Sequence, residues 1–312
     1  MTTTTLGKSG GLSPERARRI GATDVTRILG ISPFGCALDV WARIRGEAEP
    51  FEGNAYTLWG LATEQMHAEL LNQGELYRVV RSPGFVVHPD HDWLCASPDG
   101  EAESLVLTRD SIGTWEAKAP IWDVWEDGVP PPHYLLQAQV QMLVTGSTWG
   151  IASRLTPPKK STDEIVEVWE LDADRELHAR LIEQLSSWWQ RHIVEGRVPV
   201  DGATLESVRA IWPDPLETAT RISSEATRCW AEQEAIGEKI RTLESERDAL
   251  RGRIAVEIGA HSYGVGQDIV ISHKQTTRKS YVVKESTYRT LRAAKTLPAG
   301  IPIIPNSVQA SA

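Results

Sequence analysis

A pair of charged residues near the middle of the chain has the spacing of a hydrolytic site. Glu116 and Lys118 lie in residues 113–118, a segment whose composition predicts a short β-strand. Side chains two residues apart in a strand point to the same face, so the carboxylate and the ammonium should face one site, with Ala117 turned to the core. A charged strand facing solvent produces the same pattern, and this motif alone leaves that alternative open.

A second carboxylate is predicted close to this pair. Asp99 lies in Ser97-Pro98-Asp99-Gly100, a turn expected to end one strand and to begin the next. Carboxylate oxygens are the ligands that hard divalent cations prefer, and Mg²⁺ keeps its remaining positions for water and substrate phosphate. Together with a lysine that orients or deprotonates the attacking water, such a site has the composition needed for phosphodiester hydrolysis.

The elements that must position these residues predict an α+β core. Short β-rich runs separated by Pro, Gly, Asp and Ser between residues 77 and 118 are typical of a meander of strands. Helical spacing and capping residues predict helices that begin at Ser13 and that cover about residues 54–72, 133–145 and 174–195. Two further strands are predicted at residues 148–154 and 164–171. The order favours a central sheet flanked by helices.

The C-terminal third has a different pattern. Apolar residues spaced alternately four and three apart predict a heptad helix over residues 220–256, interrupted by Gln233 and Arg247. The seam consists of Ile222, Ala226, Cys229, Gln233, Ile236, Ile240, Leu243, Arg247, Leu250 and Ile254. A β-hairpin over 262–276, a short basic helix at 284–295 and a tail should follow. We therefore predict a flexible N-terminus over 1–12, a core over 13–212 and an extension over 213–312.

Composition and charge exclude several classes of protein. Hydrophobic residues make up 41% and charged residues 24% of the 312 residues, values typical of globular proteins rather than disordered or membrane proteins. The chain shows neither a spanning apolar stretch nor a signal-peptide pattern at its start, so we expect a cytoplasmic protein without a membrane partner. Three cysteines, Cys36, Cys95 and Cys229, are too few for a disulfide framework and are expected to be reduced core residues.

The charge is unevenly distributed along the chain. The net charge is −9, yet residues 271–312 hold seven Lys and Arg against one acid, which makes that segment +6 and the remainder −15. A basic segment on an acidic body is compatible with a polyanionic partner that contacts only part of the surface.

Five ordered blocks between about Arg16 and Arg154 resemble one known family. They are Gly21-Ala22-Thr23-Asp24 with Ile28 to Pro33; Trp59-Gly60 with Glu64; Ser97 to Gly100; Trp115 to Pro120; and Tyr134 with Gln137-Ala138-Gln139. In this order they are similar to the YqaJ-type viral recombinases, relatives of phage lambda exonuclease in the PD-(D/E)XK nuclease superfamily. The resemblance implies a PD-(D/E)XK core, a central mixed sheet flanked by helices, with the helical, coiled-coil and small β extension attached to it.

The resemblance also implies roles for individual residues. Asp99, Glu116, the Ala117 carbonyl and Glu64 match the metal ligands, and Lys118 matches the catalytic lysine. Gln137 and Gln139 match helix glutamines beside the scissile phosphate, although helical geometry places Gln141 and Tyr134, not Gln139, on the face of Gln137. Thr23 and an upstream arginine, Arg16 or Arg19, match the pocket for a terminal 5′ phosphate.

The activity implied by the resemblance is a metal-dependent exonuclease. Such an enzyme uses Mg²⁺, with Mn²⁺ as a possible substitute, to digest double-stranded DNA ends in the 5′→3′ direction and leaves a 3′ single strand for an annealing protein. A homo-oligomer, by analogy a trimeric ring, is expected. The alternatives are an endonuclease on the same core, which would cut closed circles, and a non-catalytic coiled-coil adaptor or DNA-end-binding protein.

Overall fold

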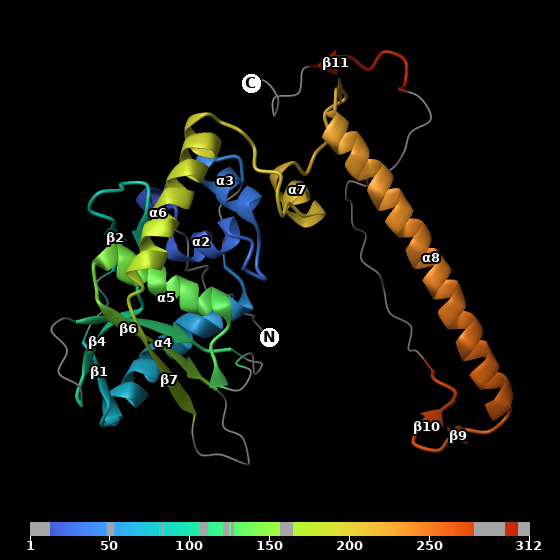
Figure 1. Ribbon diagram of the computed structural model, residues 1–312, viewed down its shortest axis with the longest axis horizontal. Helices are drawn as coiled ribbons and strands as arrows, with labels where there is room; N and C mark the ends of the chain where they lie inside the picture. Colours follow the sequence, from blue (N-terminus) through green and yellow to red (C-terminus); the bar gives the residue numbers. More distant parts are fainter. Residues whose placement is uncertain are drawn as a thin grey trace, which may run out of the picture. The chain divides into compact units, whose positions relative to one another are not determined.

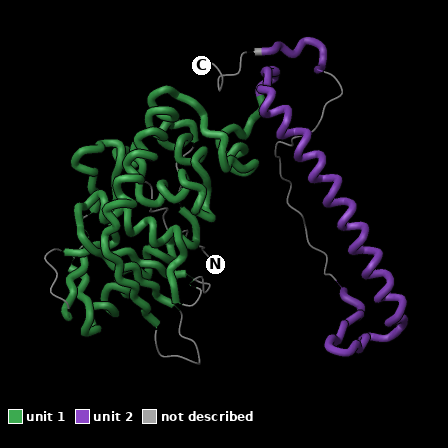
Figure 2. The backbone as a smooth tube through the Cα atoms, viewed as in Figure 1, with its two compact units in different colours: residues 1–215, 311–312 green, residues 216–310 purple. Residues whose placement is uncertain are grey.

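A computed structural model describes residues 13–48, 53–80, 82, 84–106, 112–120, 125, 128–156, 165–277 and 297–304. The chain divides into two compact units, residues 1–215 with 311–312 and residues 216–310 (Figure 2). This division lies three residues after the predicted boundary at 212/213. The predicted N-terminal segment 1–12 and the predicted basic helix at 284–295 lie outside the described residues.

A five-stranded mixed sheet forms the centre of unit 1, with the strand order β1-β4-β5-β6-β7. The strands are β1 (Tyr77–Val79), β4 (Gly100–Ser104), β5 (Gly113–Lys118), β6 (Trp149–Leu155) and β7 (Val166–Asp172). β5 and β6 run parallel, with Glu116 opposite Ala152, and the other neighbours are antiparallel. The predicted meander is only partly a single sheet, because β2 (Val86–Val87) and β3 (Cys95–Ala96) pair separately.

Helices cover both faces of this sheet (Figure 1). The long helices of unit 1 are α4 (Ala55–Gln73), α5 (Pro132–Thr145) and α6 (Arg175–Trp189), and the last continues into a π-helical turn, η2 (Gln190–Val194). The shorter ones are α1 (Pro14–Ala17), α2 (Ala22–Ile28), α3 (Ala37–Arg45) and α7 (Leu205–Ile211). The α+β class, a central mixed sheet flanked by helices, is thereby confirmed.

Two apolar clusters fix which helix lies on which face. Leu71 of α4 packs with Trp115, Trp149 and Ile151 of the sheet, and Ala117 lies against the same cluster. A second cluster joins α5 to α2, β3 and α6; it contains Ile20, Val25, Leu94, Leu136, Val140, Leu181 and Leu185. Because strand side chains alternate, Trp115 and Ala117 face α4 while Glu116 and Lys118 face α5.

Unit 2 is built around one long helix, α8 (Ser224–Ile258), which has 35 residues. Ser223 caps its N-terminus by accepting a hydrogen bond from the Ala226 backbone N–H. The predicted hairpin is present as β9 (Tyr263–Val265) paired with β10 (Val270–Ser272), and β8 (Ala219–Thr220) pairs with β11 (Ile303–Ile304). The long helix confirms the helical reading of the heptad segment.

The cysteine prediction needs one correction. All three cysteines are free; Cys36 and Cys95 are buried in unit 1, but Cys229 is exposed on α8. The expectation of a core position is wrong for Cys229, because within the described part of unit 2 nothing covers that side of the helix. No described helix is long and apolar enough to span a bilayer.

Candidate active site

A glycine lets Asp99 approach the central strand. A side chain on Gly100 would place its Cβ 2.6 Å from Trp115 Cε3 and 2.9 Å from Val79 Cγ1, so the turn can lie against β5 only without one. A backbone hydrogen bond then joins this turn to β5, because Asp99 donates its N–H to the Trp115 carbonyl at 3.1 Å. The Asp99 carboxylate in turn accepts the Ala117 N–H at 2.8 Å. These contacts place Asp99 beside Glu116 and Lys118.

Glu116 is the most completely bonded group of the site. Its side chain is buried, and its Oε1 accepts hydrogen bonds from Gln137 Nε2 at 2.6 Å and from Lys118 Nζ. Its Oε2 accepts a hydrogen bond from Gln141 Nε2. A buried carboxylate is costly unless it is paired and hydrogen-bonded, and this one is both. The α5 amides therefore hold it in a single orientation.

Lys118 lies between this carboxylate and the ring of Tyr134. Its Nζ also donates to Gln137 Oε1 at 3.3 Å and lies 4.9 Å from the Tyr134 ring centroid. Burial opposes the charged form of the lysine, but Glu116 and Asp99 outweigh it and raise the pKa of Lys118. The lysine is therefore held as a positioned cation in this arrangement.

The carboxylates disfavour one another's charge. Burial, followed by the charge of Glu116, raises the pKa of Asp99 well above its usual range. The same two causes, in the same order, raise the pKa of Glu64. Glu64 lies on α4, whose start is tied to the end of β5 by a hydrogen bond from Trp59 Nε1 to the Ala119 carbonyl at 3.0 Å. Trp59 of the Trp-Gly block thus fixes the position of α4 along the axis of β5.

The donor set fits a hard divalent cation in chemistry. Asp99, Glu116 and Glu64 supply carboxylate oxygens that repel one another, and Ala117 supplies a carbonyl on the strand between them. Among the described residues, Gln141 Oε1 is buried beside Glu116 without a hydrogen-bond partner. Within that same part of the chain, no three His, Cys, Asp or Glu residues form a ready-made ligand cluster. In this structure the carboxylate oxygens of Glu116 accept hydrogen bonds from Lys118, Gln137 and Gln141.

A cavity of about 690 Å³ opens in front of Lys118. Its lining includes Thr23, Arg27, Trp59, Lys118, Tyr134 and Gln137. Thr23 lies in the first turn of α2, and the neighbouring Asp24 fixes that turn in two ways. Its carboxylate accepts the Gly21 N–H at 2.7 Å, which caps the helix, and it forms an ion pair with Arg43 at 2.6 Å. The predicted 5′-phosphate residue Thr23 therefore shares a cavity with the predicted catalytic lysine.

Neither predicted arginine lines this cavity. Arg19 donates to the carbonyls of Asp92 at 2.6 Å and Glu15 at 2.7 Å, and it borders a different hollow, with Trp93 and Trp189. Arg16, on the short helix α1, is absent from the lining as well. The arginine that does line it is Arg27, one helical turn after Thr23. Its Nε donates to the Phe34 carbonyl at 2.8 Å, and its Nη1 lies 3.8 Å from Asp24 Oδ1.

The α5 glutamines separate into two groups. Gln139 faces away from Glu116: its Nε2 donates to the Asp172 carbonyl at 2.8 Å, and its Oε1 accepts the Asp174 N–H at 3.0 Å. His178 Nε2 lies 2.9 Å from the same Oε1. Gln139 thus joins α5 to the start of α6 instead of reaching the site, a correction to the role implied for it. Gln141 takes that place, as the helical spacing from Gln137 had indicated.

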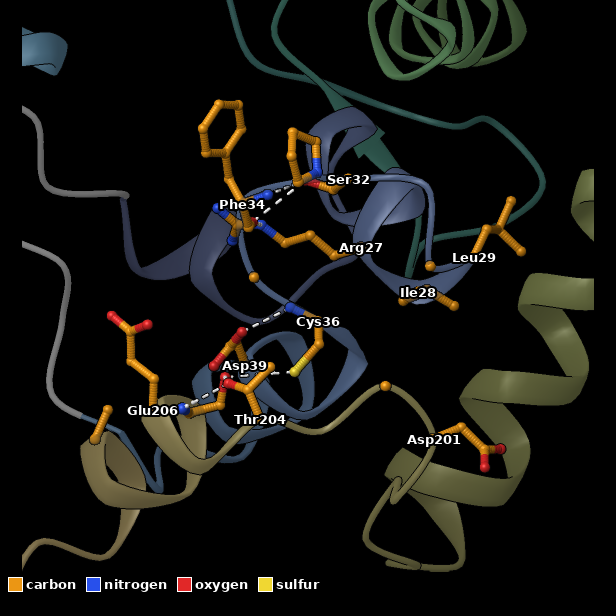
Figure 3. Close-up of a pocket in the computed structure, with 16 residues that line it drawn as sticks. Arg27, Ile28, Leu29, Ser32, Phe34, Cys36, Asp39, Asp201, Thr204 and Glu206 are labelled. Atoms are coloured by element: carbon orange, nitrogen blue, oxygen red, sulfur yellow. Dashed lines mark hydrogen bonds between the residues drawn. The ribbon is translucent and has the colours of Figure 1, made fainter. Parts of the chain in front are cut away.

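A second hollow, of about 760 Å³, lies behind the loop that follows α2 (Figure 3). Its wall contains Arg27, Phe34, Cys36, Asp39, Thr204 and Glu206. The Cys36 N–H donates to Asp39 Oδ2 at 2.7 Å, which caps α3, as Figure 3 shows. Arg27 and Phe34 line both hollows, so this loop is the partition between them. Asp39 and Thr204 are engaged in helix caps, and Arg27 donates to the Phe34 carbonyl.

Comparison with known proteins supports the family drawn from the motifs. Residues 13–148 match the model of the YqaJ-like viral recombinase domain. YqaJ of Bacillus subtilis (strain 168), described as an uncharacterized protein, is 23% identical over 260 residues, covering 80% of this chain and 78% of the relative. The matched residues include Glu64, Asp99, Glu116 and Lys118, so the domain match covers the whole site.

Two solved structures are also similar. The alkaline exonuclease LHK-Exo from Laribacter hongkongensis is 23% identical, covers 58% of this chain and 90% of its own, and has a TM-score of 0.45. A phage-related exonuclease from Haemophilus somnus 129PT is 14% identical, covers 57% of this chain and 96% of its own, and has a TM-score of 0.41. Both matches cover little more than half of this chain.

Proposed function

We propose that this chain, which carries a YqaJ-like viral recombinase domain over residues 13–148, is a metal-dependent exonuclease acting on double-stranded DNA ends. It digests in the 5′→3′ direction and leaves a 3′ single strand for an annealing protein. The observation that carries this proposal is the arrangement around Glu116. The buried carboxylate of Glu116 holds Lys118 beside a second carboxylate, Asp99, whose pKa is raised. Lys118 in turn lines a cavity together with Thr23 and Arg27.

The protein groups have separable roles in this proposal. Asp99, Glu116, the Ala117 carbonyl and Glu64 would hold the cation, with Mg²⁺ as the expected ion and Mn²⁺ as a substitute. When bound, the cation polarises the phosphodiester and lowers the pKa of water. Lys118 Nζ, held by Glu116 and Gln137, orients the attacking water and stabilises developing negative charge on the phosphate. Gln137 and Gln141 keep Glu116 from rotating away.

The end specificity is assigned to the far side of the same cavity. Thr23 offers a hydroxyl, and Arg27 offers a guanidinium whose remaining N–H groups can bind a phosphate through charge-assisted hydrogen bonds. Arg19 is engaged by two backbone carbonyls and a separate hollow, so Arg27 is the better candidate for the terminal 5′ phosphate.

The decisive experiment is digestion of linear duplexes labelled at one 5′ or one 3′ end, with Mg²⁺ or with EDTA. We expect early release of the 5′ label, a longer-lived 3′ label and no reaction in EDTA. Closed circular DNA should remain intact; if it is cut, the chain is an endonuclease. Absence of cleavage under all metal conditions would favour a DNA-end-binding protein or adaptor.

The terminal-phosphate assignment has its own test. Replacing Arg27 with Ala should remove the preference for 5′-phosphorylated over 5′-hydroxyl ends, because the charge-assisted contact is lost. Arg19→Ala is the matched control, and it should keep the preference. If only Arg19→Ala loses the preference, the terminal-phosphate pocket lies on the other side of α2.

A further inference from the structure

The long helix of unit 2 exposes an apolar stripe along most of its length. α8 has 35 residues and would extend about 52 Å. Its only buried residue is Ile258, at the end where the hairpin packs. Ile236, Ile240, Leu243, Leu250 and Ile254 are between 42% and 62% exposed. These side chains lie on one stripe at heptad spacing, which is the pattern of a helix that buries this stripe against another helix.

The residues within the stripe favour a two-stranded partner. With Leu243 and Leu250 at the d positions, the a positions between and around them are Ile240, Arg247 and Ile254. β-branched residues at a with Leu at d favour parallel dimers over trimers. A polar residue at a single a position fixes register and strand number at a cost in stability, and Gln233 and Arg247 occupy two such positions.

The charges beside the stripe distinguish the two possible orientations. In a parallel, in-register pair, Lys239 at g faces Glu244 at e of the partner, and Glu246 at g faces Arg251 at e. At the g–e positions of Glu225 and Glu232, which meet Trp230 and Gly237, no like charges face each other. Arg247, at an a position, faces its own copy across the axis, and this like-charge contact is the one that weakens the parallel pair.

An antiparallel pair is electrostatically worse. With the apolar layers matched about the centre of the stripe, residues at g face residues at g. Lys239 then faces its own copy and Glu232 faces Glu246, while Glu225 facing Arg253 is the attractive g–g pair. Like charges at such positions destabilise helix pairs. The flanking charges therefore favour the parallel arrangement, in which both charged g–e pairs attract, over the antiparallel one, in which repulsive g–g pairs outnumber the attractive one.

We infer that a second copy of this chain covers the stripe, forming a parallel, in-register two-stranded coiled coil of α8. The interface includes Cys229, which is exposed and lies at a d position. In the parallel pair the two Cys229 side chains face each other across the axis. In the antiparallel pair each would lie opposite Arg247. The trimeric ring expected from the family resemblance is a different assembly, and a mass of three chains in the test below would favour it over this pair.

The first test uses the full-length chain and its own cysteine. Light scattering at micromolar concentration should give twice the chain mass, and mild oxidation by a copper–phenanthroline reagent should yield a disulfide-linked dimer. Each bridge forms from two thiols with loss of two electrons and two protons to the oxidant. Cys229→Ser should abolish the bridge and keep the dimer. A monomer would mean that something other than a second copy covers the stripe, and it overturns the inference.

The second test separates the stripe from the rest of the helix. Ile240→Asp with Leu243→Asp should give a monomer that retains its helical circular dichroism. The matched control, Thr242→Asp with Ser245→Asp, puts the same charges at positions c and f and should remain dimeric. A dimer that survives the first pair of changes is held elsewhere, and the inference fails.

The third test fixes the orientation. Lys239→Glu alone should weaken self-association about tenfold, because it turns the g–e attraction into repulsion. Adding Glu244→Lys should restore it. Restoration is expected only for the parallel pair, since these two positions do not face each other in the antiparallel one. Failure to restore, combined with no Cys229 bridge, would overturn the parallel arrangement.

Discussion

The two units of this chain treat burial in opposite ways. Unit 1 buries a charged side chain together with its hydrogen-bond partners: Glu116 is 2% exposed and accepts three hydrogen bonds. Unit 2 leaves apolar side chains in water: Leu243 on α8 is 62% exposed. A buried charge with partners is typical of a site that works within one molecule, whereas an exposed apolar stripe indicates a surface completed by another. The contrast assigns the chemistry to unit 1 and assembly to unit 2.

The largest expected effect tests the assignment of the chemistry. Lys118→Ala should lower the cleavage rate by about 10²–10⁴-fold, the usual contribution of a positioned proton-transfer or orienting group. Folding should be preserved, because Glu116 keeps its hydrogen bonds from Gln137 and Gln141 when the lysine is removed. The rate of single-turnover cleavage checks this, with duplex binding in EDTA as the control for fold. A near wild-type rate would remove Lys118 from the site.

A smaller effect compares two glutamines on the same helix. Gln141→Met keeps the volume and removes the hydrogen bond to Glu116 Oε2, so cleavage or metal affinity should fall about 10–100-fold. Gln139→Met is the matched control: it breaks the link to Asp172, Asp174 and His178 and should lower the melting temperature more than the rate. Metal titration and thermal melting of both variants separate these outcomes. The opposite result would restore Gln139 to the role that the family resemblance implies.

Helix geometry explains why the sequence predicted the contact of Gln141 but not the different position of Gln139. An α-helix turns about 100° per residue, so Gln139 lies about 200° from Gln137 while Gln141 lies only about 40° from it. That spacing indicated Gln141, but the motif drew attention to Gln139. Which face of α5 meets β5 depends on the packing of both faces of the sheet, which the motif does not contain.

Other parts of the site were predictable to different degrees. The strand rule placed Glu116 and Lys118 on one face, because it depends only on neighbouring residues. The choice among Arg16, Arg19 and Arg27 depends on where the loop after α2 returns, through the bond from Arg27 to the Phe34 carbonyl. In unit 2, periodicity predicted the helix but not the exposure of Cys229, because the partner of a heptad stripe is not encoded in its spacing.

A still smaller effect tests burial in unit 1 through pH. His67 is 1% exposed, with Nε2 3.0 Å from Ser153 Oγ, and burial lowers its pKa to about 4. The folded state therefore keeps it neutral, while the unfolded chain protonates it near its ordinary value of about 6.5. Stability from this group is fully present above that value and is lost as the pH falls toward 4. At pH 5 the loss should be about 2 kcal/mol.

Denaturant unfolding of wild type and His67→Gln between pH 7 and pH 4.5 measures this contribution as a difference in slope. The matched control is His261→Gln, which changes an exposed histidine of unit 2. The slope should flatten only for His67→Gln. Equal slopes in all three proteins would mean that water reaches His67 in the folded state, and that the folded protein does not hold this histidine neutral.

The smallest expected effect is the most direct test of the contrast between the units. A chain ending at Pro215 retains both apolar clusters described for unit 1, whose buried residues all precede that position. Its unfolding free energy should change by less than about 1 kcal/mol, a shift of under about 4 °C in the melting temperature of a domain of this size. Cleavage of a short linear duplex should persist, while self-association through α8 is lost. If the truncated chain melts far lower or loses cleavage together with its fold, the two units share stabilising contacts. Assembly would then be part of what holds the site together, and not a separate property of α8.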